Sequence, residues 1–91
     1  MKASETLKTA ASLVSGDRAK KHGDAQENHD KIAKLWSAYL GNTINAHDVA
    51  CLMTLLKIAR TQCGETNPDD YVDAAGYAAI AGELMEKREH L

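Results

Sequence analysis

Phenylalanine is absent from this 91-residue sequence, and its aromatic side chains are limited to one tryptophan and three tyrosines. The core must therefore be built from aliphatic side chains and alanine. The sequence also has little excess charge of either sign, since its net charge is only −2. That value excludes the strongly basic surface typical of duplex-DNA binders, so we expect no nucleic-acid partner. The longest apolar run, VACLM at 49–53, is far short of the ~20 residues that span a bilayer, so we expect no membrane insertion.

The first ten residues, MKASETLKTA, contain no apolar stretch like the core of a signal peptide. We therefore expect a cytoplasmic protein in which Cys51 and Cys63 remain reduced thiols. The length predicts one domain covering residues 1–91. A chain of this size buries roughly 64% of its unfolded surface when it folds alone. We therefore also expect a homo-oligomer, dimeric or larger.

No segment alternates apolar and polar residues over the length of a strand, whereas apolar residues recur with the 3.6-residue period of a helix. The pattern predicts an all-α fold, an antiparallel bundle of four helices at about 4–15, 25–40, 46–62 and 68–87. Three of these helices begin at an N-cap signal: Asp24 with Glu27, Asn45 with Asp48, and Asn67 before Pro68. Glycines mark the ends of the first three: Gly16, Gly41 and Gly64.

Two segments predict how the helices pack. The segment 46–62 is apolar nearly all the way round, which is typical of a central helix. The segment 74–82, AAGYAAIAG, is rich in small residues. Glycine inside a helix costs about 1 kcal/mol relative to alanine. Gly76 and Gly82 therefore indicate close packing against another helix, within the chain or across a dimer.

Acidic residues recur at helical spacing on two of the predicted helices. Glu27 and Asp30 are three residues apart, Asp69 and Asp73 four apart, and Asp70 lies three before Asp73. If the helices 25–40 and 68–87 lie side by side, these oxygen ligands could converge on Mg²⁺. Alternatively, Asp69 and Asp70 are first-turn acids that favour the helix dipole, and Glu27 is a capping residue. The sequence leaves both interpretations open.

Asp73 lies beyond the first turn, among small apolar residues, and therefore needs a partner. Lys57 and Arg60, the only cations on the segment 46–62, are the candidates. They either form an ion pair with Asp73 that fixes helix register or line an anion pocket. Tyr77, one turn beyond Asp73, could stack on a base or hydrogen-bond to a ligand.

The polar loop 16–23 holds further cations, which either extend a phosphate pocket or are simply solvated. The members of this set are Arg18, Lys20, Lys21 and His22. No G-x-S-x-G, Walker-type, H-E-x-x-H or C-x-x-C motif occurs, so nucleophilic and zinc-hydrolase mechanisms lack a motif.

Three segments carry a resemblance: VSGDRAKKHGDAQENHDKIAKLWSAYLG (14–41), INAHDVACLMTLLKIAR (44–60) and DDYVDAAGYAA (69–79). Together they resemble a family of small helical proteins of tailed bacteriophages and prophages, mostly of unassigned function. The order G-D-R, H-G, K-x-x-R and D-x-x-x-D-x-x-x-Y is more distantly similar to the phage nucleotide-modification-associated domain. Both resemble the all-α nucleotide pyrophosphohydrolases of the MazG and dimeric dUTPase type, which hold Mg²⁺ with paired acids on adjacent helices.

The resemblance implies a nucleotide-facing role in the cytoplasm of the host bacterium. Glu27 and Asp30 would correspond to the first acidic pair, and Asp69 or Asp70 with Asp73 to the second. Lys57 and Arg60 would contact phosphates. We therefore expect a protein that binds a nucleotide or another small phosphate ligand, with Mg²⁺ as the implied cofactor. Two alternatives are a Mg²⁺-dependent pyrophosphohydrolase and a module that binds a host protein, so the sequence leaves open whether the chain is an enzyme.

Overall fold

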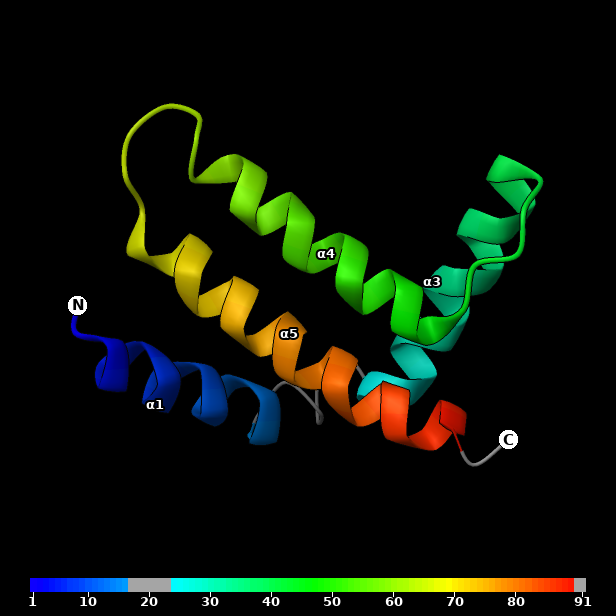
Figure 1. The fold of residues 1–91 in the computed structure, drawn as a ribbon, viewed down its shortest axis with the longest axis horizontal. Coiled ribbons are helices and arrows are strands. Elements are labelled where there is room, and N and C mark those ends of the chain that lie inside the picture. Colours follow the sequence, from blue (N-terminus) through cyan, green and yellow to red (C-terminus); the bar gives the residue numbers. More distant parts are fainter. Residues whose placement is uncertain (17–23, 90–91) are drawn as a thin grey trace.

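The computed structural model describes residues 1–16 and 24–89, with the backbone alone at 87–89, and all of its regular structure there is helical. The helices are α1 (Ala3–Ser15), α3 (Ala25–Leu40), α4 (Ala46–Arg60) and α5 (Pro68–Glu89) (Figure 1). The predicted all-α class with four helices is confirmed, and every boundary lies within two residues of its predicted position. Within the described residues, no helix has the length and hydropathy that a membrane span requires.

The predicted caps fix where the helices begin and end. Asp24 accepts a hydrogen bond from the backbone amide of Glu27 at 2.8 Å. Asn45 and Asp48 form a reciprocal capping box, with bonds of 2.8 and 3.1 Å. Gly41 takes a left-handed conformation, φ 71°, and its amide donates to the carbonyl of Ser37. Because these residues satisfy the terminal backbone groups, the helix limits follow from local sequence.

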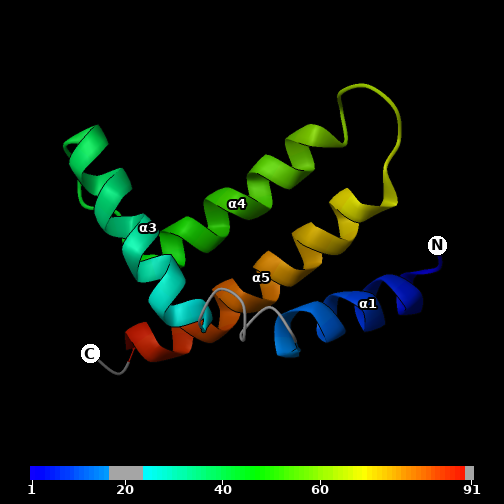
Figure 2. The ribbon, with the colours of Figure 1, turned by 180° about the vertical axis from the view of Figure 1, so that it is seen from behind.

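α5 is the central helix of the molecule. α4 packs along one side of it in the antiparallel direction, and α1 packs along another side in the same direction as α5 (Figures 1 and 2). α3 crosses the N-terminal part of α4 and then diverges from it, so that the two helices form a V (Figures 1 and 2). This arrangement places the N-terminal half of α5 between α1 and α4.

The prediction that the segment 46–62 is the central helix is wrong. Only one stripe of α4, which includes Val49 and Ala50, is buried. On the opposite side, Leu52, Leu55 and Leu56 are 42%, 63% and 47% exposed. The reason is that α5 and the crossing α3 cover one face of α4, and no other described helix lies over the second face.

The core is built mainly from small side chains. Among the described residues, its buried apolar members are Ala10, Ala33, Ala46, Val49, Ala50, Val72, Ala74, Ala81 and Leu84. A methyl group added at Gly76 would lie 3.4 Å from a methyl carbon of Val14, so close packing against α1 is confirmed there. At Gly82 an added methyl group would meet nothing within 4 Å, so the chain itself provides no packing partner at that position. Both cysteines are free thiols, as predicted.

Candidate functional site

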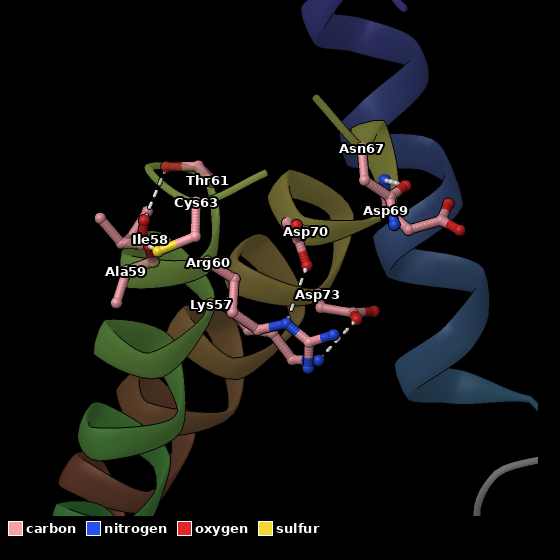
Figure 3. A network of polar contacts seen from close by, with 10 residues as sticks. All are labelled: Lys57, Ile58, Ala59, Arg60, Thr61, Cys63, Asn67, Asp69, Asp70 and Asp73. Carbon is pink, nitrogen blue, oxygen red and sulfur yellow. Dashed lines mark hydrogen bonds and ion pairs between the residues drawn. The ribbon is translucent and has the colours of Figure 1, made fainter. Parts of the chain in front are cut away.

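Four charged side chains lie together where α4 and α5 run antiparallel. Lys57 and Arg60 are one turn apart on α4, and Asp70 and Asp73 are one turn apart on α5. Lys57 Nζ lies 3.0 Å from Asp73 Oδ2, and Arg60 Nε lies 3.7 Å from Asp70 Oδ1 (Figure 3). Because the helices are antiparallel, the later cation meets the earlier acid. We call these four residues the charge cluster.

Burial within the charge cluster is uneven. The Lys57 and Asp73 side chains are 15% and 32% exposed, whereas the Asp70 side chain is 9% exposed beside a largely open Arg60. The predicted ion pair of Asp73 is thus formed with Lys57, and Arg60 serves a different acid. A largely desolvated carboxylate needs a cation or hydrogen bonds, so both pairs fix the register of α4 on α5.

Asp69 and Asp70, although adjacent, have different roles. Asp69 is exposed, and its backbone amide donates to the side chain of Asn67 at 3.0 Å, which caps the helix. Asp70 instead points toward Arg60 (Figure 3). The interpretation of both residues as ordinary first-turn acids holds for Asp69 and is incomplete for Asp70, because Asp70 is buried and paired.

Asp73 also lines a cleft between α1 and α5. The cleft is shallow and encloses about 20 Å³, on the order of a single water molecule. Its lining residues are Ala10, Leu13, Val14, Val72, Asp73, Gly76, Tyr77 and Ile80. The cleft is therefore an apolar groove with one carboxylate and one phenol in its wall. The carboxylate of Asp73 therefore belongs both to this groove and to the charge cluster.

His29 is one of the two buried polar residues among those described, a position that its spacing from known ligand motifs does not reveal. Its Nδ1 lies 2.8 Å from the carbonyl oxygen of Ala25, and since a carbonyl only accepts, Nδ1 donates. Its ring centroid lies 6.2 Å from that of Tyr77. His29 thus links α3 to the tyrosine of the cleft. Its spacing was a signal for burial, because it stands four residues before the buried Ala33 on α3.

The structure does not bring the four predicted metal-binding acids together. Glu27 and Asp30 are exposed on α3, and Asp30 accepts a hydrogen bond from Gln26 at 3.0 Å. α3 begins near the C-terminal half of α5, whereas Asp69 and Asp73 lie in its N-terminal half (Figures 1 and 2). In the part of the chain that the structure describes, no three histidine, cysteine or acidic side chains could hold a metal ion together.

Three predicted phosphate ligands, Arg18, Lys21 and His22, lie outside the described residues. In the sequence they follow shortly after α1, and Val14 of α1 lines the cleft.

Comparisons with known proteins give consistent matches. The model of a family described as "Domain of unknown function (DUF6378)" matches residues 5–85. The Gene 55 protein of Mycobacterium phage L5 is 48% identical over 80 residues, which are 87% of this chain and 51% of that protein. The Gene 55 protein of Mycobacterium phage D29 is 41% identical over 81 residues, 89% of this chain and 54% of that protein. The chain therefore spans about half the length of these curated relatives. No solved structure matches it at a significant level.

Proposed function

Because the chain belongs to the family described as Domain of unknown function (DUF6378), its function must be argued from its own residues, and we propose that it binds a nucleotide or a similar phosphate-carrying ligand. The ligand would lie against the α1–α5 cleft and reach the charge cluster. The observation that carries this proposal is the double position of Asp73, which pairs with Lys57 and also lines the cleft.

The cleft and the charge cluster suit the two halves of a nucleotide. Ligand sites are mostly apolar with a few polar groups, and the lining of the cleft has this composition. The cleft itself encloses only about 20 Å³, so a base would lie against its apolar rim rather than inside it. Tyr77 offers an aromatic face or a hydroxyl group to that base. Such stacking is worth about 1–3 kcal/mol per base.

The cations of the charge cluster would face the phosphates. Arg60 is largely exposed although its Nε pairs with Asp70. A guanidinium carries five N–H donors, so pairing at Nε leaves donors for an anion. Lys57 is held in place by Asp73 and would add a second positive charge. The loop cations Arg18, Lys21 and His22, just after α1, belong to the same proposal.

Mg²⁺ would be held by a carboxylate together with ligand phosphates, since Mg²⁺ sites commonly use one or two carboxylates plus substrate phosphates. In this proposal, Asp73 and Asp69 of α5 would supply the carboxylates. When bound, Mg²⁺ would polarise the phosphates and supply an activated water if the ligand is hydrolysed. The relatives are phage proteins, so we place this activity in the cytoplasm of an infected bacterium.

Calorimetric titration with nucleoside triphosphates, with and without Mg²⁺, tests the proposal. We expect binding to the wild-type chain and at least a tenfold weaker affinity, about 1.4 kcal/mol, in Tyr77→Leu and in Arg60→Gln. Tyr71→Leu and Lys34→Gln are matched controls, because Tyr71 and Lys34 are exposed and lie outside the cleft and the charge cluster. Both controls should bind like the wild type.

Product analysis of the same mixtures distinguishes binding from hydrolysis. Release of pyrophosphate that requires Mg²⁺ and is lost in Asp73→Asn would identify an enzyme. Binding without turnover would identify a non-catalytic binder. Absence of binding to any nucleotide, with or without Mg²⁺, would reject the proposal and favour the alternative of a protein-interaction module.

A further inference from the structure

One face of α4 is apolar and uncovered by the rest of the described chain. Leu52, Leu55, Leu56 and Ala59 follow the spacing i, i+3, i+4, i+7, so they form one stripe along the helix. All four are exposed, and the stripe lies opposite the buried Ala46, Val49 and Ala50. We call it the α4 stripe. A helix that buries one face and leaves a second apolar face exposed has the pattern of an interface element.

The side chains of the α4 stripe are large as well as exposed. Leu52, Leu55 and Leu56 are 42%, 63% and 47% exposed. A row of exposed leucines along one helix is typical of a surface that a second molecule covers.

We propose that two copies of this chain pair through their α4 stripes, antiparallel, about a two-fold axis near Thr54 and Leu55. The charges at the ends of the stripe favour this partner and this direction. Asp48 stands four residues before Leu52, and Arg60 stands four after Leu56. An antiparallel pair places Asp48 beside the partner's Arg60 at both ends, whereas a parallel pair places like charges together.

Two further arguments support an isologous pair. Antiparallel helices oppose their macrodipoles, which is favourable for adjacent helices. A two-fold axis also lets the same patch serve both copies, so the interface closes on itself without leaving a second uncovered stripe. The α1–α5 cleft is not part of this surface, and Arg60 at the end of the stripe is the one residue that this proposal shares with the proposed ligand site.

The oligomeric state of the full chain tests the proposal. Sedimentation velocity over a dilution series should show a dimer that dissociates on dilution into chains of 9.9 kDa. Leu55→Glu places two carboxylates near the axis and should abolish the dimer. Leu7→Glu is the matched control, because Leu7 on α1 is 64% exposed, as Leu55 is 63% exposed, and lies off the stripe. This control should remain dimeric.

Circular dichroism should show the same helix content for both variants, since each change is made at an exposed position. A wild-type chain that is monomeric at every concentration would overturn the proposal. So would a Leu55→Glu variant that dimerises as well as Leu7→Glu.

Cysteine cross-linking tests the direction of the pair. In a background with both native thiols removed, Cys51→Ala and Cys63→Ser, Leu55→Cys should form a disulfide-linked dimer on oxidation. Ala59→Cys should not, because antiparallel pairing separates the two copies of residue 59 by about 15 Å along the axis, beyond the reach of a disulfide. Efficient cross-linking through residue 59 would reject the antiparallel arrangement.

Discussion

At the scale of single residues, the charge cluster shows how a carboxylate acquires its role from where it lies on a helix. Asp69, Asp70 and Asp73 share one helix, yet Asp69 is exposed, Asp70 pairs with Arg60 and Asp73 pairs with Lys57. Asp69 contributes a favourable first-turn charge worth a few tenths of a kcal/mol. Asp70 is largely desolvated, so Arg60 offsets the free-energy cost of burying its charge. Asp69 is exposed and has no such cost.

Asp70→Asn and Asp69→Asn therefore differ in their effect on stability. We expect Asp70→Asn to lower the free energy of unfolding by about 1–2 kcal/mol, because it removes a charged partner of Arg60 at a buried site. Asp69→Asn, at an exposed site, should change it by less than about 0.5 kcal/mol. Urea unfolding followed by circular dichroism measures both values. Equal effects would show that the burial of Asp70 contributes nothing to stability.

At the scale of helices, α5 is central because its small residues let two helices approach it. Gly76 lies against Val14 of α1, whereas the position of Gly82 is open. A glycine in a helix costs about 1 kcal/mol relative to alanine unless close packing requires it. Packing of α1 gives Gly76 a structural reason, and the described chain provides none for Gly82.

Gly82→Ala should consequently stabilise the protein. We expect a gain of about 0.5–1 kcal/mol and a rise of roughly 3–6 °C in the melting temperature, measured by scanning calorimetry. Gly76→Leu, by contrast, should push α1 away and lower the melting temperature. Destabilisation by Gly82→Ala would reveal a second molecule packed on that face of α5.

Helix limits could be predicted from the sequence because caps are local. Asn45 and Asp48 satisfy each other's backbone amides within four residues, and Gly41 ends α3 by its own conformation. The role of α4 could not be predicted in this way. Its apolar pattern has two faces, and the pattern alone does not show whether the second face is covered by the same chain or by another molecule.

The candidate site, too, could be predicted from the sequence only in part. A cationic partner for Asp73 could be predicted, because a carboxylate among apolar residues needs one and Lys57 and Arg60 are the only cations on the segment 46–62. The pair of Arg60 with Asp70 was not predicted. Convergence of Glu27 and Asp30 on Asp69 and Asp73 depended instead on which ends of α3 and α5 meet. That arrangement follows from how α3 crosses α4, which the residues of α3 alone do not specify.

At the scale of the whole molecule, stability should be coupled to association. Most of the buried apolar side chains in the described chain are alanines, while several leucines of α4 remain exposed. Full burial of a leucine is worth roughly 1.5–3 kcal/mol, and these leucines are already about half buried, so covering each contributes roughly 1 kcal/mol. Pairing through the α4 stripe would therefore add a substantial part of the free energy that keeps the chain folded.

The melting temperature should then depend on protein concentration, because an equilibrium that binds two folded copies shifts toward the folded state by mass action. For a dimer of this size, a tenfold increase in concentration should raise the melting temperature by about 3–4 °C. In Leu55→Glu the melting temperature should be lower and independent of concentration, whereas in Leu7→Glu it should follow the wild type. Calorimetric scans of the three proteins at several concentrations measure this dependence. A wild-type melting temperature that does not change with concentration would mean that folding draws no stability from a second copy.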